Sequence, residues 1–169
     1  MATPPFDRLV MATVIAGAGI GAAIDLRTRR VPNPLTLLLA ASGVGFAVFG
    51  VGGLTIGASL LGLALGMALM LPGHLLGATG AGDVKLFAAL GALVGPAHIA
   101  TAFVYTAIAG GAIAVAVAMH RRRLRRTIEH AAQLVVSADA AAIESPLENN
   151  RFAYAPAIAV GTMLVALGF

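Results

Sequence analysis

The chain has 169 residues, of which 59% are hydrophobic and only 11% are charged, and it contains no cysteine. Soluble domains carry about a quarter charged residues, so this composition excludes an ordinary soluble domain and indicates a membrane protein, while the missing cysteines exclude disulfides and thiolate metal sites. The excess of positive charge comes from basic residues clustered at the ends of apolar runs, a placement that favours control of membrane topology over nucleic-acid binding.

Apolar runs close to the about 20 residues needed to cross a bilayer recur along the whole length. We expect six spans, at 8–25, 35–51, 54–73, 84–95, 97–119 and 152–169. The fourth span is short, and Gly95-Pro96 is expected to close it. The sequence therefore predicts an all-α fold class: a polytopic membrane helix bundle of about six transmembrane helices, forming one domain over 1–169.

The basic residues predict the orientation of this bundle. Three arginines follow the first span, and Lys and Arg collect on cytoplasmic loops. Alternation of the six spans then places every basic residue except Arg8 on the cytoplasmic side, with both termini external. The one long polar connection, 120–151, becomes a cytoplasmic loop between spans five and six, either as a solvated linker or with an interfacial helix.

Glycines recur at four-residue steps within the spans. Small residues at this spacing let helix backbones approach closely. They could form a dimer face, but internal packing of a compact bundle is favoured. The pairs are Gly17/Gly21, Gly53/Gly57, Gly62/Gly66 and Gly91/Gly95.

Asp25 lies where the first span is expected to end, in the run Asp25-Leu26-Arg27-Thr28-Arg29-Arg30-Val31-Pro32-Asn33. Pro32 cannot continue a helix, whereas Asn33 suits an N-cap followed by Pro34 at the first helical position. The arginines are explained as cytoplasmic anchors. A carboxylate at the edge of hydrocarbon is costly and indicates function, although pairing with a nearby arginine is an equal structural alternative.

Asp83 lies where the fourth span begins, in Gly80-Ala81-Gly82-Asp83-Val84-Lys85. The glycines permit a sharp backbone path and the close approach of another segment. The spacing excludes a Walker phosphate loop, and no strand precedes it as a dinucleotide fingerprint requires. Taken alone, Asp83 is equally well explained as a helix N-cap.

Together the two acids indicate chemistry, because the predicted topology brings both to one side of the membrane. Two carboxylates that share a water and a proton are the apparatus of aspartic peptidases. A helix N-terminus and Lys85 favour the ionised form of Asp83, and a helix C-terminus favours the protonated form of Asp25. We therefore expect Asp83 to act as the base and Asp25 as the proton donor.

The Asp25 run ending in Val31-Pro32-Asn33, the Gly-x-Gly-Asp at 80–83 with Lys85, and Tyr154-Ala155-Pro156-Ala157-Ile158 resemble the type IV prepilin peptidase family. The small size is similar to the branch that serves Flp-type (tight-adherence) pili. The resemblance implies a bacterial inner-membrane, multi-pass aspartic endopeptidase with catalytic Asp25 and Asp83. It implies removal of the short basic leader of prepilins at the cytoplasmic face, without a metal or cofactor.

Larger members of that family also carry a cysteine-rich metal-binding domain and N-methylate the trimmed pilin. This chain has neither the domain nor a cysteine, so methyltransferase activity is not expected. Phe152-Ala153 replaces the proline that relatives often have before the tyrosine. The expected partners are a prepilin and membrane lipid, with no nucleic acid.

Several residues are expected to support the two acids. Lys85 either tunes Asp83, holds a substrate carbonyl or extends to the interface. Tyr154 and Pro156 shape the last span near the cytoplasmic face or touch substrate. The four histidines lack the spacing of metal ligands and are explained by interface or loop positions. The supporting set is Gly80, Gly82, Lys85, Pro32, Asn33, Tyr154 and Pro156, and the histidines are His74, His98, His120 and His130.

A non-enzymatic alternative stays open: a small transporter subunit or a pilus-assembly scaffold whose acids carry protons or hold helices together. The geometry of the carboxyl groups distinguishes the two. Catalysis needs Asp25 and Asp83 to come within about one water molecule of each other, whereas carboxyls fixed far apart favour the alternative.

Overall fold

The computed structural model describes residues 6–120 and 154–169. These form five α-helices, and no strand occurs among them, so the predicted all-α class is confirmed. A short 3₁₀ turn at Val51–Gly53 links the second and third helices. The helices are α1 (Arg8–Thr28), α2 (Asn33–Val48), α3 (Ile56–Leu75), α4 (Ala81–His120) and α6 (Ala155–Ala166).

Three of the described helices are long and apolar enough to cross a membrane: α1, α3 and the part of α4 up to Ala116. The other two, α2 with 16 residues and α6 with 12, are shorter apolar helices. Six crossings and external termini therefore stay predictions. The loop expected at 120–151 lies, apart from its first residue, outside the described part of the chain.

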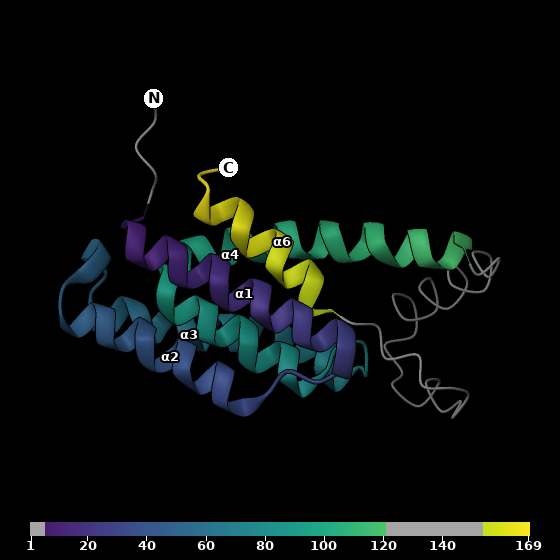
Figure 1. The fold of residues 1–169 in the computed structure, drawn as a ribbon, viewed down its shortest axis with the longest axis horizontal. Helices are drawn as coiled ribbons and strands as arrows, with labels where there is room; N and C mark the ends of the chain where they lie inside the picture. The colour runs from purple at the N-terminus through teal and green to yellow at the C-terminus, as the bar shows by residue number, and fades with distance from the viewer. Residues whose placement is uncertain (1–5, 121–153) are drawn as a thin grey trace.

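The expected break at Gly95-Pro96 is present as a kink within α4 rather than as a gap between two helices. Gly95 adopts φ 78° and ψ 175°, a conformation that only glycine enters readily. Figure 1 shows the chain turning back at this point, so that α4 has a first arm before Gly95 and a second arm after it.

Pro96 also frees a carbonyl group within α4, because it has no N–H to donate to the residue four positions earlier. That residue is Ala92, and its carbonyl oxygen accepts a hydrogen bond of 2.8 Å from the hydroxyl of Ser59 on α3. Ser59 is fully buried. A side chain of a neighbouring helix thus satisfies the polar group that the proline leaves unpaired.

Glycines bring α3 and the first arm of α4 into backbone contact. Gly62 lies against the backbone of Gly91, and Gly66 lies against the backbones of Phe87 and Ala88. In a bilayer, helices associate mainly through such close van der Waals packing, because lipid is as apolar as the helices themselves. At these positions the four-residue glycine spacing therefore serves internal packing, as predicted.

The first arm of α4 forms the centre of the fold. Its side chains Leu86, Phe87 and Leu90 are fully buried, together with Val14 of α1 and Ile158 of α6. Helices α1, α2, α3 and α6 all pack against α4. Residues in the first turn of α4 are therefore held by contacts to the rest of the bundle.

Candidate active site

Three helix ends meet at one end of the bundle: the last turn of α1, the first turn of α4 and the first turn of α6. Figure 1 shows this end opposite the one at which α1 begins and α6 ends. Asp25 comes from α1 and Asp83 from α4, and each is only 5% exposed. The two carboxylates lie close enough for the charge of Asp25 to act on Asp83. The structure thus brings together the two acids that the sequence singles out.

Asp25 lies in the last turn of α1, which continues to Thr28, so the helix ends near Asp25 as expected. The last turn is closed by Arg29, a non-glycine residue with φ 53°, whose N–H donates to the Asp25 carbonyl at 2.7 Å. Arg29 also places a positive charge near the Asp25 carboxylate.

The carboxylate of Asp25 is held by the start of α6. Its Oδ2 accepts the backbone N–H of Ala155 at 3.3 Å, across 130 residues of sequence. Ala155 is the first residue of α6, and N–H groups at a helix start have no partner within the helix. Pro156 follows and has no N–H, so the first turn of α6 directs a single donor at Asp25.

Asp83 is the third residue of α4 and reaches back to the start of the helix. Its Oδ2 accepts the N–H of Gly80 at 3.0 Å, while its own N–H donates to the Gly80 carbonyl at 3.0 Å. This is one half of a capping box, in which the carboxylate of the third helical residue binds the N–H of the residue before the helix, while Gly80 has no side chain to supply the other half. The alternative that Asp83 is itself the N-cap is therefore wrong, because Gly80 occupies the position before the helix.

This arrangement uses only one carboxylate oxygen of Asp83. The other, Oδ1, is buried and accepts no hydrogen bond from any residue that the structure describes. Buried polar atoms without a partner are uncommon, and they concentrate where a site serves water or a ligand. Asp83 thus presents one fixed oxygen and one oxygen open to another group.

Gly80 and Gly82 make room for this geometry. A Cβ at position 80 would lie 3.2 Å from Oδ2 of Asp83, and a Cβ at position 82 would lie 3.1 Å from the Cβ of Val31. Gly82 therefore lets α4 begin directly against the segment that follows α1. This is the close approach that the sequence predicts, and it brings Asp83 toward Asp25.

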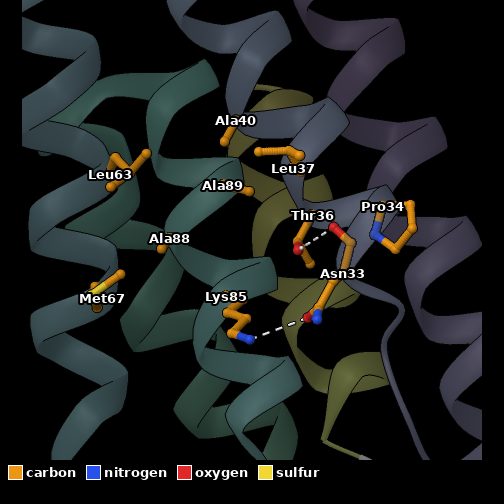
Figure 2. Close-up of a pocket in the computed structure, with 10 residues that line it drawn as sticks. All are labelled: Asn33, Pro34, Thr36, Leu37, Ala40, Leu63, Met67, Lys85, Ala88 and Ala89. Atoms are coloured by element: carbon orange, nitrogen blue, oxygen red, sulfur yellow. Dashed lines mark hydrogen bonds between the residues drawn. The ribbon is translucent and has the colours of Figure 1, made fainter.

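Lys85 does not face the acids. Its Nζ donates a hydrogen bond of 3.1 Å to Oδ1 of Asn33 on α2 (Figure 2). Residues two apart lie on different sides of a helix, so Lys85 and Asp83 point to different neighbours. The expectation that Asn33 is an N-cap is wrong, because Pro32 precedes α2 and Asn33 is its first helical residue. Its amide oxygen is engaged by Lys85 instead.

The pair of Lys85 and Asn33 marks one end of an open groove of about 510 Å³ between α2, α3 and the first arm of α4. Apart from Thr36, the remaining lining is apolar. Figure 2 shows the hydrogen bond at the lower end and the apolar side chains above it. The groove is lined by Asn33, Pro34, Thr36, Leu37, Ala40, Leu63, Met67, Lys85, Ala88 and Ala89.

Tyr154 immediately precedes α6 and is half-buried. Its ring lies against Gly110 on the second arm of α4. Burial raises the pKa of the Tyr154 phenol, and the nearby charge of Asp83 raises it further. Tyr154 is therefore a neutral hydroxyl close to the acidic pair, and it anchors the start of α6 beside them.

His74, which the sequence assigns to an interface or loop position, has a contact that the sequence analysis did not predict. The ring Nδ1 of His74, near the end of α3, lies 3.0 Å from the carbonyl oxygen of Thr79. His74 precedes Asp83 by nine residues across a tight connection, and this short separation is the signal that could have found it.

The arrangement is suited to acid–base chemistry on a bound water. Two buried carboxylates whose charges interact can hold one proton between them, so that one acts as a base and the other as an acid. Among residues 6–120 and 154–169, no group of three or more His, Cys, Asp or Glu side chains could hold a metal ion.

Comparison with protein families agrees with this site. The model of the type IV leader peptidase family matches residues 12–115, which include both acids and cover more than half of the chain. Neither a curated protein nor a solved structure matches the chain significantly. With the matched region spanning α1 to the second arm of α4, the chain belongs to the type IV leader peptidase family.

Proposed function

We propose that this protein is a membrane aspartic endopeptidase that removes the leader of type IV prepilins, with Asp25 and Asp83 as its catalytic pair. The observation that carries the proposal is the meeting of these two buried carboxylates at the junction of α1, α4 and α6. Family membership supports the peptidase class. The proximity of the acids favours this function over a transporter subunit or an assembly scaffold.

In the proposed reaction, a water molecule lies between the two carboxyl groups. The ionised carboxylate takes a proton from the water while the water oxygen forms a bond to the scissile carbonyl carbon. The protonated carboxyl donates its proton to the carbonyl oxygen. The tetrahedral intermediate then collapses: the carboxyl group that received the proton of the water gives it to the leaving nitrogen, the C–N bond breaks, and the other carboxylate takes a proton back from a hydroxyl of the intermediate.

The roles follow from what holds each acid. Asp83 has one oxygen fixed by Gly80 and one without a protein partner, so Oδ1 of Asp83 is the base that contacts the water. Asp25 then supplies the proton to the carbonyl oxygen. Tyr154, neutral and close to Asp83, is placed to donate to the intermediate or to substrate.

The substrate is a prepilin of the Flp type, cleaved between its short basic leader and its apolar segment. The acids lie at the end of α1 that continues into Arg27, Arg29 and Arg30. Since arginines collect on the cytoplasmic side, the site faces the cytoplasm of a bacterial inner membrane. A prepilin leader reaches it there while the apolar segment stays in the bilayer.

The test is prepilin cleavage by Asp25→Asn and Asp83→Asn, each first shown to fold by thermal unfolding in detergent. Both substitutions keep a side-chain oxygen for the N–H of Ala155 or Gly80, so the fold should survive. Each should lower the cleavage rate by about 100-fold or more, because general acid–base catalysis contributes about that much.

Asp7→Asn is the matched control. Asp7 caps α1 by accepting the N–H of Leu9 at 2.8 Å, which an asparagine can also do, and it lies at the other end of α1. Its cleavage rate should equal that of the unsubstituted protein. Full cleavage by either Asp25→Asn or Asp83→Asn would overturn the paired mechanism.

A further inference from the structure

The peptide group between Thr79 and Gly80 is hydrogen-bonded at both of its ends. Its carbonyl oxygen, which belongs to Thr79, lies 3.0 Å from Nδ1 of His74. Its N–H, which belongs to Gly80, donates to Oδ2 of Asp83 at 3.0 Å. A carbonyl oxygen can only accept, so the His74 ring must donate from Nδ1. One planar unit therefore connects the imidazole to the carboxylate.

This connection fixes direction as well as distance. A trans peptide is planar, with its C=O and N–H pointing in opposite directions. A donor that holds the carbonyl oxygen on one side therefore aims the N–H to the other side, at Asp83. Hydrogen bonds in series also polarise one another, so donation by His74 makes the Gly80 N–H a better donor to the carboxylate.

The surrounding loop keeps His74 in register with this peptide. The N–H groups of Ala78 and Thr79 both donate to the Gly73 carbonyl, at 2.8 and 3.2 Å, and the N–H of Gly77 donates to the His74 carbonyl at 3.0 Å. The loop thus folds back on the end of α3. His74 itself is partly buried and on a helix, which gives it a fixed position from which to donate.

We propose that His74 is a positioning residue for Asp83: through the Thr79–Gly80 peptide it fixes which carboxylate oxygen is held and which is presented to the reaction. The proposal rests on the catalytic role of Asp83 proposed above. His74 touches neither the substrate nor the reacting atoms. It acts on Asp83 alone, so its loss changes the chemical step and leaves substrate binding intact.

Without the imidazole donor, the Thr79–Gly80 peptide can rotate about its flanking bonds, and Gly80 on one side offers little resistance. The N–H then leaves Oδ2, and Asp83 is free to turn its carboxylate. Each carboxylate oxygen of Asp83 can then face either the protein or the water. The fraction of molecules in which Oδ1 is aimed at the scissile bond therefore falls.

The test compares three substitutions at position 74. In His74→Asn the amide nitrogen lies where Nδ1 lies, in His74→Gln it lies one bond farther out, and His74→Leu has similar bulk with no donor. For cleavage of a purified prepilin in detergent, His74→Leu should lower kcat about tenfold with KM unchanged, the effect of losing one hydrogen bond at the transition state. His74→Asn should recover kcat to within about threefold.

His98→Leu is the matched control. Nδ1 of His98 lies 3.1 Å from the Val94 carbonyl, the same kind of contact, and its ring stacks edge-on against Phe6 near the chain's start. Its kcat and KM should be unchanged. If His74→Leu does not fold, the comparison of His74→Asn with His74→Gln carries the same test, with Gln expected to be the slower of the two.

A second measurement does not depend on cleavage. Hydrogen exchange at the Gly80 amide should be faster in His74→Leu than in the unsubstituted protein, and normal in His74→Asn. Equal kcat values for Leu and Asn, a change in KM alone, or unchanged Gly80 exchange would each overturn the positioning role. If Asp83→Asn cleaves prepilin normally but hydrogen exchange at the Gly80 amide is still faster in His74→Leu than in His74→Asn, the proposed function fails. The effect of His74 on the position of Asp83 is then still supported.

Discussion

The phenol ring of Tyr154 lies directly against Gly110, so that a Cβ at position 110 would come within 2.8 Å of Cε2 in the ring. Gly110 belongs to the second arm of α4, and Tyr154 is the residue before α6. The next N–H after Tyr154 is that of Ala155, which binds Asp25. A contact between two distant segments therefore sets the position of a donor to the acidic pair.

Gly110→Ala should lower both cleavage and stability, because the new methyl group must push the Tyr154 ring and, with it, the start of α6. We expect cleavage to fall about tenfold, since displacing a positioned group by a fraction of an ångström is costly for catalysis. Cleavage kinetics and thermal unfolding in detergent measure the two effects.

Gly111→Ala is the control for this substitution, because it lies in the same helix with nothing within 4 Å of the added Cβ. Alanine is intrinsically better than glycine in a helix by about 1 kcal/mol, so Gly111→Ala should be neutral or slightly stabilising. Equal behaviour of the two variants would show that the contact with Tyr154 does not matter.

Gly82→Ala should separate the start of α4 from the segment after α1. Its Cβ would lie 3.1 Å from the Cβ and 3.2 Å from the backbone N of Val31, and backbone cannot move aside as a flexible side chain can. We expect a loss of activity of about tenfold or more, larger than any loss of stability, because Asp83 moves relative to Asp25.

Gly45→Ala in α2 provides the comparison, since nothing lies within 4 Å of its Cβ. It should cleave normally. Normal cleavage by Gly82→Ala as well would contradict the idea that this close approach positions Asp83.

Lys85→Met should have little effect on catalysis, because Lys85 donates to Asn33 and not to Asp83. The hydrogen bond is exposed, so its contribution to stability should be below about 1 kcal/mol. A double-mutant cycle with Asn33→Ala, measured by unfolding, should give a coupling energy of that size.

The opposite expectation from the sequence, that Lys85 tunes Asp83, makes a different prediction for the same cycle. It requires Lys85→Met to lower kcat by more than about tenfold whether or not Asn33 is present. Cleavage assays on the single and double variants separate the two outcomes.

Ser59→Ala should destabilise the fold by about 1–3 kcal/mol, the cost of a buried carbonyl left without a donor. This carbonyl belongs to Ala92. Pro96 has no N–H to donate to it, and the Ser59 hydroxyl donates instead. Thr13→Ala is a suitable reference, because the hydroxyl of Thr13 bonds the Leu9 carbonyl of its own helix at an exposed site. Equal decreases in the unfolding midpoint of the two variants would contradict this expectation.

The sequence was sufficient to predict the helical class and to single out the two acids that the structure brings to one end of the bundle. Asp25 and Asp83 stand out because charges are rare in the spans and because their neighbours, Pro32 and Gly82, have few structural uses other than turns and close approach. Gly95-Pro96 was a sound signal for a break, since both residues oppose a straight helix. These features are local, and local chemistry can be read from a sequence.

What failed depended on contacts between distant segments. Asn33 has the residue type of an N-cap, but Lys85 from another helix engages its side chain. The contact of Asp25 with Ala155 joins residues far apart in the chain, and no periodicity indicates it. His74 lacks the spacing of a metal ligand and was set aside for that reason, and its contact with the Thr79 carbonyl oxygen carries no sequence signature.

The hydrogen bond from Ala155 to Asp25 has a consequence for how the protein is made. Helix α1 is synthesised before α6 and carries a carboxylate whose donor is encoded 130 residues later. Contacts of such long sequence separation form late, because the intervening chain must first be ordered. A nascent chain that has inserted α1 to α4 therefore holds an incomplete centre, and only docking of α6 completes it.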